Sequence, residues 1–226
     1  MKNIVSLIAL FFSLISYSQK TFDFSVSTIY KVEEGKDLKN SRTEIILTDD
    51  SSNVMTVFRN SKKKLVAIIQ TKEKVNHYFE LINDNDDILS INNFQYQFSI
   101  EHKNNECWTK DLEYEVVKLK DSSSNYNTKI VTYKNKKKVG SLCLKNSDSQ
   151  YNYYNNFKKG YLHHFDSCNK LTIGSNFLVE SAVFRNHSQK DYRKVTLIKN
   201  EIVNLKIHID KLRYRSIGYT QGFNRY

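Results

Sequence analysis

The sequence predicts an all-β protein: an antiparallel meander, sandwich or open half-barrel with at most one short helix. Apolar and polar residues alternate with a period of two over many short segments, as in half-buried strands. Polar clusters suited to turns separate these segments at intervals of roughly 8–12 residues, which is typical of all-β domains. No long segment has the 3.6-residue period of an amphipathic helix.

The alternation is clearest near the two ends of the chain. In FDFSVS (22–27) the apolar residues share one face, and in IVNLKIHID (202–210) Val203, Leu205, Ile207 and Ile209 do the same. Further strands are predicted at 43–48, 54–59, 64–70, 75–82, 94–100, 112–120, 128–134 and 138–145. Because the chain has no proline, Asn, Asp and Ser must form the turns between them.

Three segments are less clear. Residues 175–186 could form a helix, since Leu178 and Ala182 could share a face, but their β-branched and aromatic content equally suits a strand. Residues 145–160 are polar and rich in tyrosine, and we predict a long loop inside one domain. Residues 211–226 could add a last strand or end in a disordered tail.

The first residues predict export. Lys2 precedes an uncharged apolar run from Ile4 to Ile15, and the small residues Ser16 and Ser18 follow, which is the pattern of a secretory signal peptide. The run is shorter than the roughly 20 residues of a membrane-spanning helix. We predict a signal peptide at residues 1–18, with an uncleaved N-terminal anchor as the alternative.

The end of this leader, SYSQK, resembles the signal-peptide ends of exported proteins from the Bacteroidota, the flavobacterial group especially. The resemblance covers the leader alone and implies a periplasmic or extracellular location. No later segment is apolar over a comparable length, so residues 19–226 are predicted to form a single all-β domain without a transmembrane segment.

The composition is globular and basic. Hydrophobic residues make up 39% of the chain and can supply a core, and the formal net charge is +11. A basic surface could attract polyanions. Lysine far outnumbers arginine, however, and arginine is the residue that grips phosphates and bases bidentately. The residues abundant here are also those encoded by A/T-rich codons, so the charge favours solubility over a specific nucleic-acid partner.

The segment YLHHFDSCNK (161–170) holds the strongest concentration of reactive side chains. In a strand, the adjacent His163 and His164 point to opposite faces and cannot share a metal ion. His164, Asp166 and Cys168 are the candidate site residues, either as part of a metal site that needs a third ligand or as a nucleophilic arrangement. The alternative, which we favour, is a strand that runs into a turn.

Other candidates are weaker. Cys107, Cys143 and Cys168 allow three single disulfide pairings with one thiol left over, and their spacings match no zinc motif. His77 interrupts an apolar strand and is expected to be partly buried and hydrogen-bonded. The acidic run at 83–87 is interpreted as a hairpin turn and not a calcium loop. Residues 151–157, YNYYNNF, could expose aromatic side chains to a sugar or a partner. We predict no cofactor and no metal site.

These observations leave three hypotheses and favour a non-enzymatic function. The first is an exported envelope or secreted module that binds a lipid, a glycan or a protein partner. Such exported β meanders resemble the lipoprotein-carrier type, and that resemblance implies an apolar concavity. The second is a secreted hydrolase that uses His163 or His164 with Asp166. The third is a polyanion-binding protein that acts through Lys62–Lys64, Lys136–Lys138, Lys158 and Lys159.

Overall fold

The computed structural model describes residues 19–50, 53–83, 89, 93–101, 109–119, 125–151, 153–162, 171, 173, 176–188 and 190–215. Within these residues, eleven strands form one antiparallel sheet, so the predicted all-β class is confirmed. The strands are β1 (Lys20–Glu34), β2 (Asn40–Thr48), β3 (Val54–Arg59), β4 (Leu65–Gln70), β5 (Val75–Leu81), β6 (Phe94–Glu101), β7 (Leu112–Lys118), β8 (Thr128–Lys134), β9 (Lys137–Asp148), β10 (Phe177–Asn186) and β11 (Asp191–Ile209). A short 3₁₀ turn, η1 (Lys36–Leu38), and one α-helix, α2 (Tyr154–Tyr161), complete the described part.

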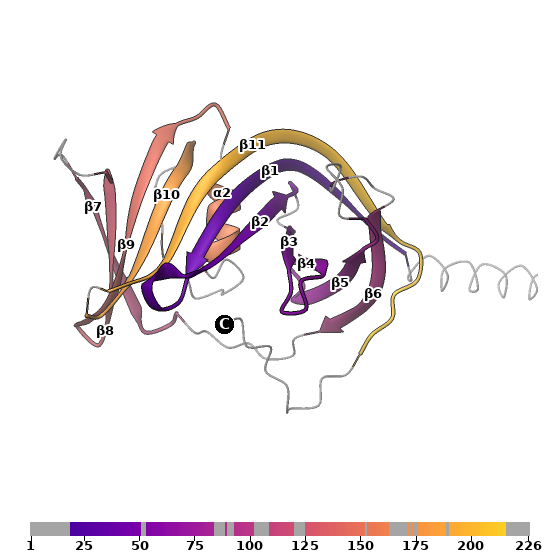
Figure 1. Ribbon diagram of the computed structural model, residues 1–226, viewed down its shortest axis with the longest axis horizontal. Helices are drawn as coiled ribbons and strands as arrows, with labels where there is room; N and C mark the ends of the chain where they lie inside the picture. The colour runs from indigo at the N-terminus through magenta and orange to yellow at the C-terminus, as the bar shows by residue number, and fades with distance from the viewer. Residues whose placement is uncertain are drawn as a thin grey trace, which may run out of the picture.

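The sheet consists of two meanders joined at their first and last strands. Its order is β6-β5-β4-β3-β2-β1-β11-β10-β9-β8-β7. The long strands β1 and β11 pair antiparallel, and their register shifts between Phe24 and Val26 and between Ile29 and Tyr30. Such bulges bend a strand and increase its twist. The paired strands accordingly arch over the molecule, with α2 beneath the arch (Figure 1).

The β1–β6 half of the sheet is partly closed by the segment that follows β11. The backbone N–H of Ser99 in β6 donates to the carbonyl of Arg213 at 2.8 Å, and the N–H of Arg215 donates to the carbonyl of Ser99 at 2.9 Å. This contact is an isolated bridge between Ser99 and Tyr214 and not a further strand. The last strand considered for residues 211–226 is therefore not formed over 211–215, the part of that segment that the structure describes.

The core consists of two clusters on opposite faces of β2. The cluster that carries α2, here the helix-side core, includes Tyr30, Ile46, Leu142, Leu144, Phe157, Val179 and Val195. The other, here the rolled-half core, includes Phe22, Phe24, Leu47, Met55, Ile69, Phe79 and Leu205. Because both faces of β2 are covered, Glu44–Thr48 are buried in succession. This explains why Ile45, Ile46 and Leu47 form an unbroken apolar run where a half-buried strand would alternate.

Helix α2 corrects the prediction of a long loop at residues 145–160. Strand β9 continues to Asp148, and α2 begins at Tyr154. The contact between α2 and the sheet is partly polar. The side-chain amide of Asn156 donates to the Ile46 carbonyl at 3.2 Å and accepts from the Thr48 hydroxyl at 2.5 Å. Within the described residues, no helix is long and apolar enough to cross a membrane.

The helix approaches the sheet most closely at Gly160. A Cβ atom at this position would lie 2.3 Å from Cδ1 of Ile46, whose side chain is fully buried. Glycine therefore permits the close contact between α2 and β2. The aromatic side chains around it are buried too, since Tyr153, Tyr154 and Phe157 are at most 5% exposed. The interpretation of residues 151–157 as an exposed aromatic surface is therefore wrong, apart from the exposed Tyr151.

The described turns follow the chemistry that the sequence predicts. The side-chain Oδ1 of Asn60 accepts the backbone N–H groups of Lys62 and Lys64, and the Oδ1 of Asn186 accepts the backbone N–H group of Lys190. Asn135 and Lys136 both have positive φ in the two-residue β8–β9 turn. Residues 177–186 form strand β10, so the helix considered for 175–186 is wrong and the alternative strand is confirmed.

Candidate ligand groove

The strands β7 to β11 present a continuous apolar row on the face that carries α2. The register places Val116, Ile130, Leu142, Phe184 and Arg193 directly opposite one another across the five strands. Residues that oppose one another in a sheet point to the same face. Four of the five are apolar, so the row forms a hydrophobic floor that ends in one arginine at β11.

A groove of about 440 Å³ lies over this floor. The end of α2 and the residues after it form its second wall, through Tyr161, Leu162 and Leu171. Both Leu162 and Leu171 are buried in the helix-side core. The volume falls in the range of small-molecule sites, about 300–1,000 Å³.

The groove continues toward the edge of the sheet. A second hollow, of about 580 Å³, is lined by the start of β7 and by the β8–β9 turn, with Lys110 and Lys136 among its residues. Leu112 and Tyr114 line both hollows. The lining of this hollow also includes Asp111 and Glu113, so the apolar floor opens at this edge onto a polar hollow that carries charges of both signs.

Four charged side chains lie beside the groove on the same face. The Arg42 guanidinium is 2.6 Å from the Glu34 carboxylate and 2.7 Å from that of Glu44, and Arg193 is 3.6 Å from Glu34. Burial disfavours the charged form of Arg42, but the two glutamates outweigh it and raise the pKa of Arg42. The two arginines and two glutamates together carry no net charge.

Arg193 is the member of this network that lines the groove. Its Nε is buried and has no hydrogen-bond acceptor among the described residues, and its guanidinium lies 5.7 Å from the Phe184 ring centroid. A buried donor without an acceptor costs free energy. Because the Arg193 side chain as a whole is 28% exposed, an anionic or carbonyl group at this end of the apolar floor would pair with its exposed part and not with the buried Nε.

Tyr161 separates the charged network from the rest of the helix-side core. Its ring packs edge-on against Tyr30 with centroids 5.7 Å apart. Burial, reinforced by the Glu44 carboxylate, raises the pKa of Tyr161 well above its ordinary value. The phenol therefore stays neutral, and its hydroxyl is buried behind the wall of the groove.

The predicted reactive residues do not enter this description. His163, His164, Asp166 and Cys168 lie outside the described residues, and the site predicted there stays a prediction. The first two residues of the same motif, Tyr161 and Leu162, do line the groove.

Among the cysteines, Cys143 is a buried free thiol with the Arg185 guanidinium 3.7 Å from its sulfur. No pairing that includes Cys143 is therefore formed in this structure, and Cys107 and Cys168 lie outside the described part. The described residues contain no group of three or more His, Cys, Asp or Glu side chains placed to hold a metal ion.

The histidine and lysine predictions have separate outcomes. The Nδ1 of His77 is 2.6 Å from the Ser99 hydroxyl, so the predicted hydrogen bond is confirmed, but the side chain is fully buried where partial burial was expected. Lys159, expected in an exposed lysine-rich turn, instead lies in α2 with 8% exposure, because the helix turns it toward the sheet. Of the acidic run at 83–87, only Asn83 is described.

Sequence reasoning missed the charged network. Glu34 follows Tyr30 and Val32 in the alternation of β1, and Arg42 and Glu44 precede Ile46 in that of β2. A charged residue in the apolar phase of a strand is a signal that could have identified them.

Comparisons with known proteins give distant matches only. No protein-family model and no curated protein matches the chain. A domain assigned as an outer membrane lipoprotein-sorting protein from Vibrio parahaemolyticus aligns over 79% of this chain and 85% of its own, with 7% identity and a TM-score of 0.32. A LolA superfamily protein from Nitrosomonas europaea aligns over 81% of this chain and 87% of its own, with 7% identity and a TM-score of 0.30. At TM-scores of this size, neither match establishes a fold or a function for this chain.

Proposed function

We propose that this protein is an exported, non-enzymatic carrier that holds an acyl chain with an anionic or carbonyl head in the groove over β7–β11. The observation that carries the proposal is the row from Val116 to Arg193, which places an apolar floor and one incompletely paired cation in line. Each methylene group removed from water contributes about 0.8 kcal/mol, so such a floor favours an elongated apolar ligand. The apolar leader at residues 1–18 supports export.

A lipid suits the groove better than a glycan. The floor residues Ile130, Leu142 and Phe184 offer no hydrogen bonds to sugar hydroxyls, whereas the polar lining residues, Thr132, Ser141 and Asn186 among them, suit the head of a lipid. A buried hydroxyl without a partner costs free energy, whereas an acyl chain has no polar groups to satisfy.

We expect Leu112→Glu to weaken fatty-acid binding roughly tenfold or more, because a carboxylate in the groove must be desolvated whenever an acyl chain covers it. The measurement is titration of the delipidated protein with a fluorescent fatty acid. Val117→Glu is the matched control: it lies on the same strand with its side chain on the opposite face and is 37% exposed. It should leave the affinity within about twofold. Equal losses in the two variants, or no binding by the wild type, would contradict the proposal.

We expect Arg193→Met to weaken binding of a long-chain fatty acid about tenfold and to leave binding of the corresponding fatty alcohol nearly unchanged, since a hydrogen bond to a charged group contributes about 1.5–3 kcal/mol. Arg42, at 2.6 Å, still pairs with Glu34 in this variant. Displacement of the fluorescent probe by each lipid measures both affinities. Parallel losses for acid and alcohol would mean that Arg193 only supports the wall of the groove.

A further inference from the structure

The lysines of this protein gather at one end of the sheet. The β1–β2, β3–β4, β8–β9 and β10–β11 turns and the segment before β7 lie at this end, as does the β5–β6 connection, because Glu34 pairs with Arg193, Arg185 with Asp191, Leu112 with Lys134, Glu44 with Phe58 and Leu81 with Phe94. We call residues 35–39, 60–64, 109–111, 134–138 and 187–190 the hairpin rim. These ranges contain eleven lysines and two aspartates, a formal surplus of nine positive charges, while the β5–β6 connection at the same end has three aspartates, Asp84, Asp86 and Asp87, which lie outside the described residues.

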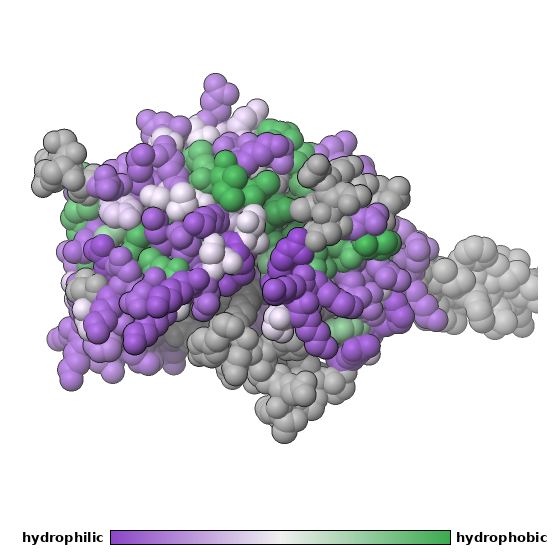
Figure 2. All heavy atoms as spheres, in the orientation of Figure 1, coloured by the Kyte–Doolittle hydropathy of each residue, from purple (hydrophilic) through white to green (hydrophobic). Residues whose placement is uncertain are grey.

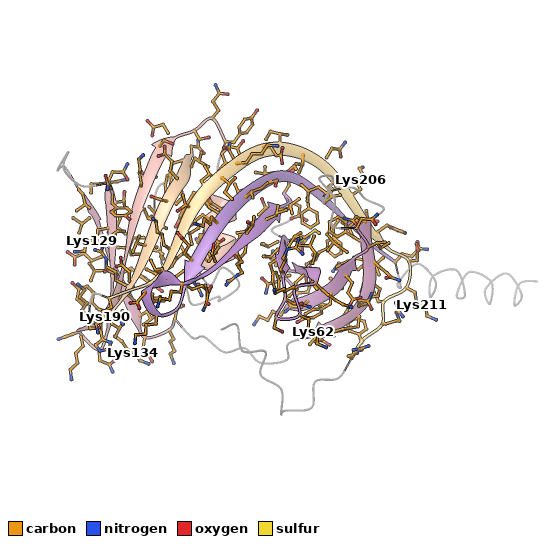
Figure 3. All side chains as sticks on the ribbon, viewed as in Figure 1. Lys62, Lys129, Lys134, Lys190, Lys206 and Lys211 are labelled. Carbon is orange, nitrogen blue, oxygen red and sulfur yellow. The ribbon has the colours of Figure 1, made fainter. Side chains whose placement is uncertain are left out.

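The opposite end of the sheet has a different balance. Its described turn residues, at 49–50, 53, 71–74, 125–127 and 210–211, contain three lysines and four acidic residues, a formal surplus of one negative charge. Lys134 and Lys190 lie near each other at the lower left of Figure 3, and Lys62 lies farther along the same lower side. The basic character is therefore directional and is not spread evenly over the surface.

The lysines of the rim are available to a partner. All eleven are exposed, and within the described residues only Lys39 has a carboxylate close to it, that of Asp37 at 3.9 Å. The surface seen in Figure 2 is hydrophilic along its lower left side. At this end of the sheet β8 and β10 finish and β7 and β9 begin. Unpaired lysines that face one direction create a positive potential over that end.

The groove opens at the same end. Lys110 and Lys136 of the rim line its outer hollow, and Leu112 follows directly into the apolar floor. Two less polar side chains lie among the lysines, Val139 at 39% and Tyr192 at 44% exposure, and both line the groove. Tyrosine is a residue favoured where protein meets the headgroup region of a bilayer.

We propose that the hairpin rim docks the protein on an anionic lipid bilayer, with the mouth of the groove toward the lipid. The inference rests on the proposed carrier function and adds the surface from which the groove is loaded. Lysines near an anionic bilayer contribute about 1 kcal/mol each, and Val139 and Tyr192 suit the headgroup layer. A nucleic-acid partner is less well matched, because base recognition relies on arginine and on groups placed for base edges.

The test is co-sedimentation of protein produced from the full chain with vesicles of phosphatidylcholine alone or with one third phosphatidylglycerol. We expect binding to the anionic vesicles only, with a steep loss as salt is raised from 50 to 300 mM. Lys136→Gln/Lys137→Gln/Lys138→Gln should lower the partition coefficient roughly 100-fold. The matched control Lys72→Gln/Lys74→Gln/Lys211→Gln removes the same charge at the opposite end and should lower it less than about fivefold.

Equal effects of the two triple variants would overturn the proposal, because net charge alone would then explain binding. Equal binding to neutral vesicles, or tighter binding to a DNA duplex than to the anionic vesicles, would overturn it as well. A failure of the docking proposal can be distinguished from a failure of the carrier proposal. The rim variant should still bind a soluble fluorescent fatty acid, and Leu112→Glu should still bind anionic vesicles.

Discussion

Phe157→Ala is expected to lower the free energy of unfolding by about 3–5 kcal/mol, the usual cost of removing a fully buried aromatic ring. Phe157 has 0% exposure and lies at the centre of the helix-side core. Its ring centroid is 5.2 Å from that of Tyr161, 6.1 Å from that of Tyr30 and 6.4 Å from that of Phe184. Because α2 has only eight residues, it depends on this packing.

Urea unfolding of the wild type and the variant measures this loss. Phe98→Ala is the control, since Phe98 is only partly buried and stacks on Tyr78 with centroids 4.8 Å apart. Phe98→Ala should lower the free energy of unfolding by less than half as much as Phe157→Ala does. A loss below about 1 kcal/mol for Phe157→Ala would show that α2 detaches without unfolding the sheet, and the second wall of the groove would then be a separate, weakly attached unit.

The strands were predictable because their signal is local. Residues 54–59 and 128–134 form β3 and β8 with the predicted bounds, since alternation and the polar clusters beside them lie within the segments themselves. The β8–β9 turn was predictable for the same reason. Its Asn135 has positive φ, a conformation that asparagine tolerates well.

Helix α2 was not predictable in this way. Its sequence, YNNFKKGY, contains tyrosine, asparagine and glycine, which have low helix propensity. It is stabilised by Phe157 in the core and by Asn156, whose amide donates to Ile46, a residue 110 positions away in the chain. Contacts over such distances leave no periodic signal in the segment, so a polar and tyrosine-rich stretch was interpreted as a loop.

The groove was predictable in kind and not in its residues. An apolar concavity follows from a meander that arches, but the row from Val116 to Arg193 depends on a register that joins five strands. Chemically reactive residue types drew attention to the segment from His163 to Cys168. Arg193 has no local signal that marks it as a site residue, because its partner Glu34 is distant in the sequence.

Acidification from about pH 6.5 to about pH 4 is expected to cost the protein about 3 kcal/mol of stability through His77. Burial, assisted by the charge of Lys20 and opposed by that of Glu73, lowers the pKa of His77 from 6.5 to about 4. Its side chain has 0% exposure, and its Nε2 has no hydrogen-bond partner among the described residues. Ser99 can accept from only one ring nitrogen, so a proton on this ring would place a buried charge in the rolled-half core and leave the N–H at Nε2 without an acceptor among the described residues.

The sign follows from proton binding. Between the two pKa values the unfolded chain carries the proton on His77 and the folded chain does not, so acid favours unfolding. Below about pH 4 both states are protonated at this residue, and the loss it causes is complete. Urea unfolding at several pH values measures the effect. His77→Gln should be less stable at pH 7 but should lose about 3 kcal/mol less than wild type on acidification, whereas the exposed His187→Gln should follow wild type.

The pH range separates His77 from the carboxylates. A hydrogen bond from Lys145 lowers the pKa of Glu180, and one from Lys31 lowers that of Glu33. A carboxyl group whose pKa is lowered by folding loses its stabilising contribution only as the pH falls below 4.5, the usual pKa of glutamate, toward the pKa of the folded state. A loss of stability between pH 6.5 and 5 that disappears in His77→Gln therefore assigns the acid sensitivity to the buried imidazole. If the variant retains that loss, the proton is taken up elsewhere, and the imidazole is not held neutral by its burial.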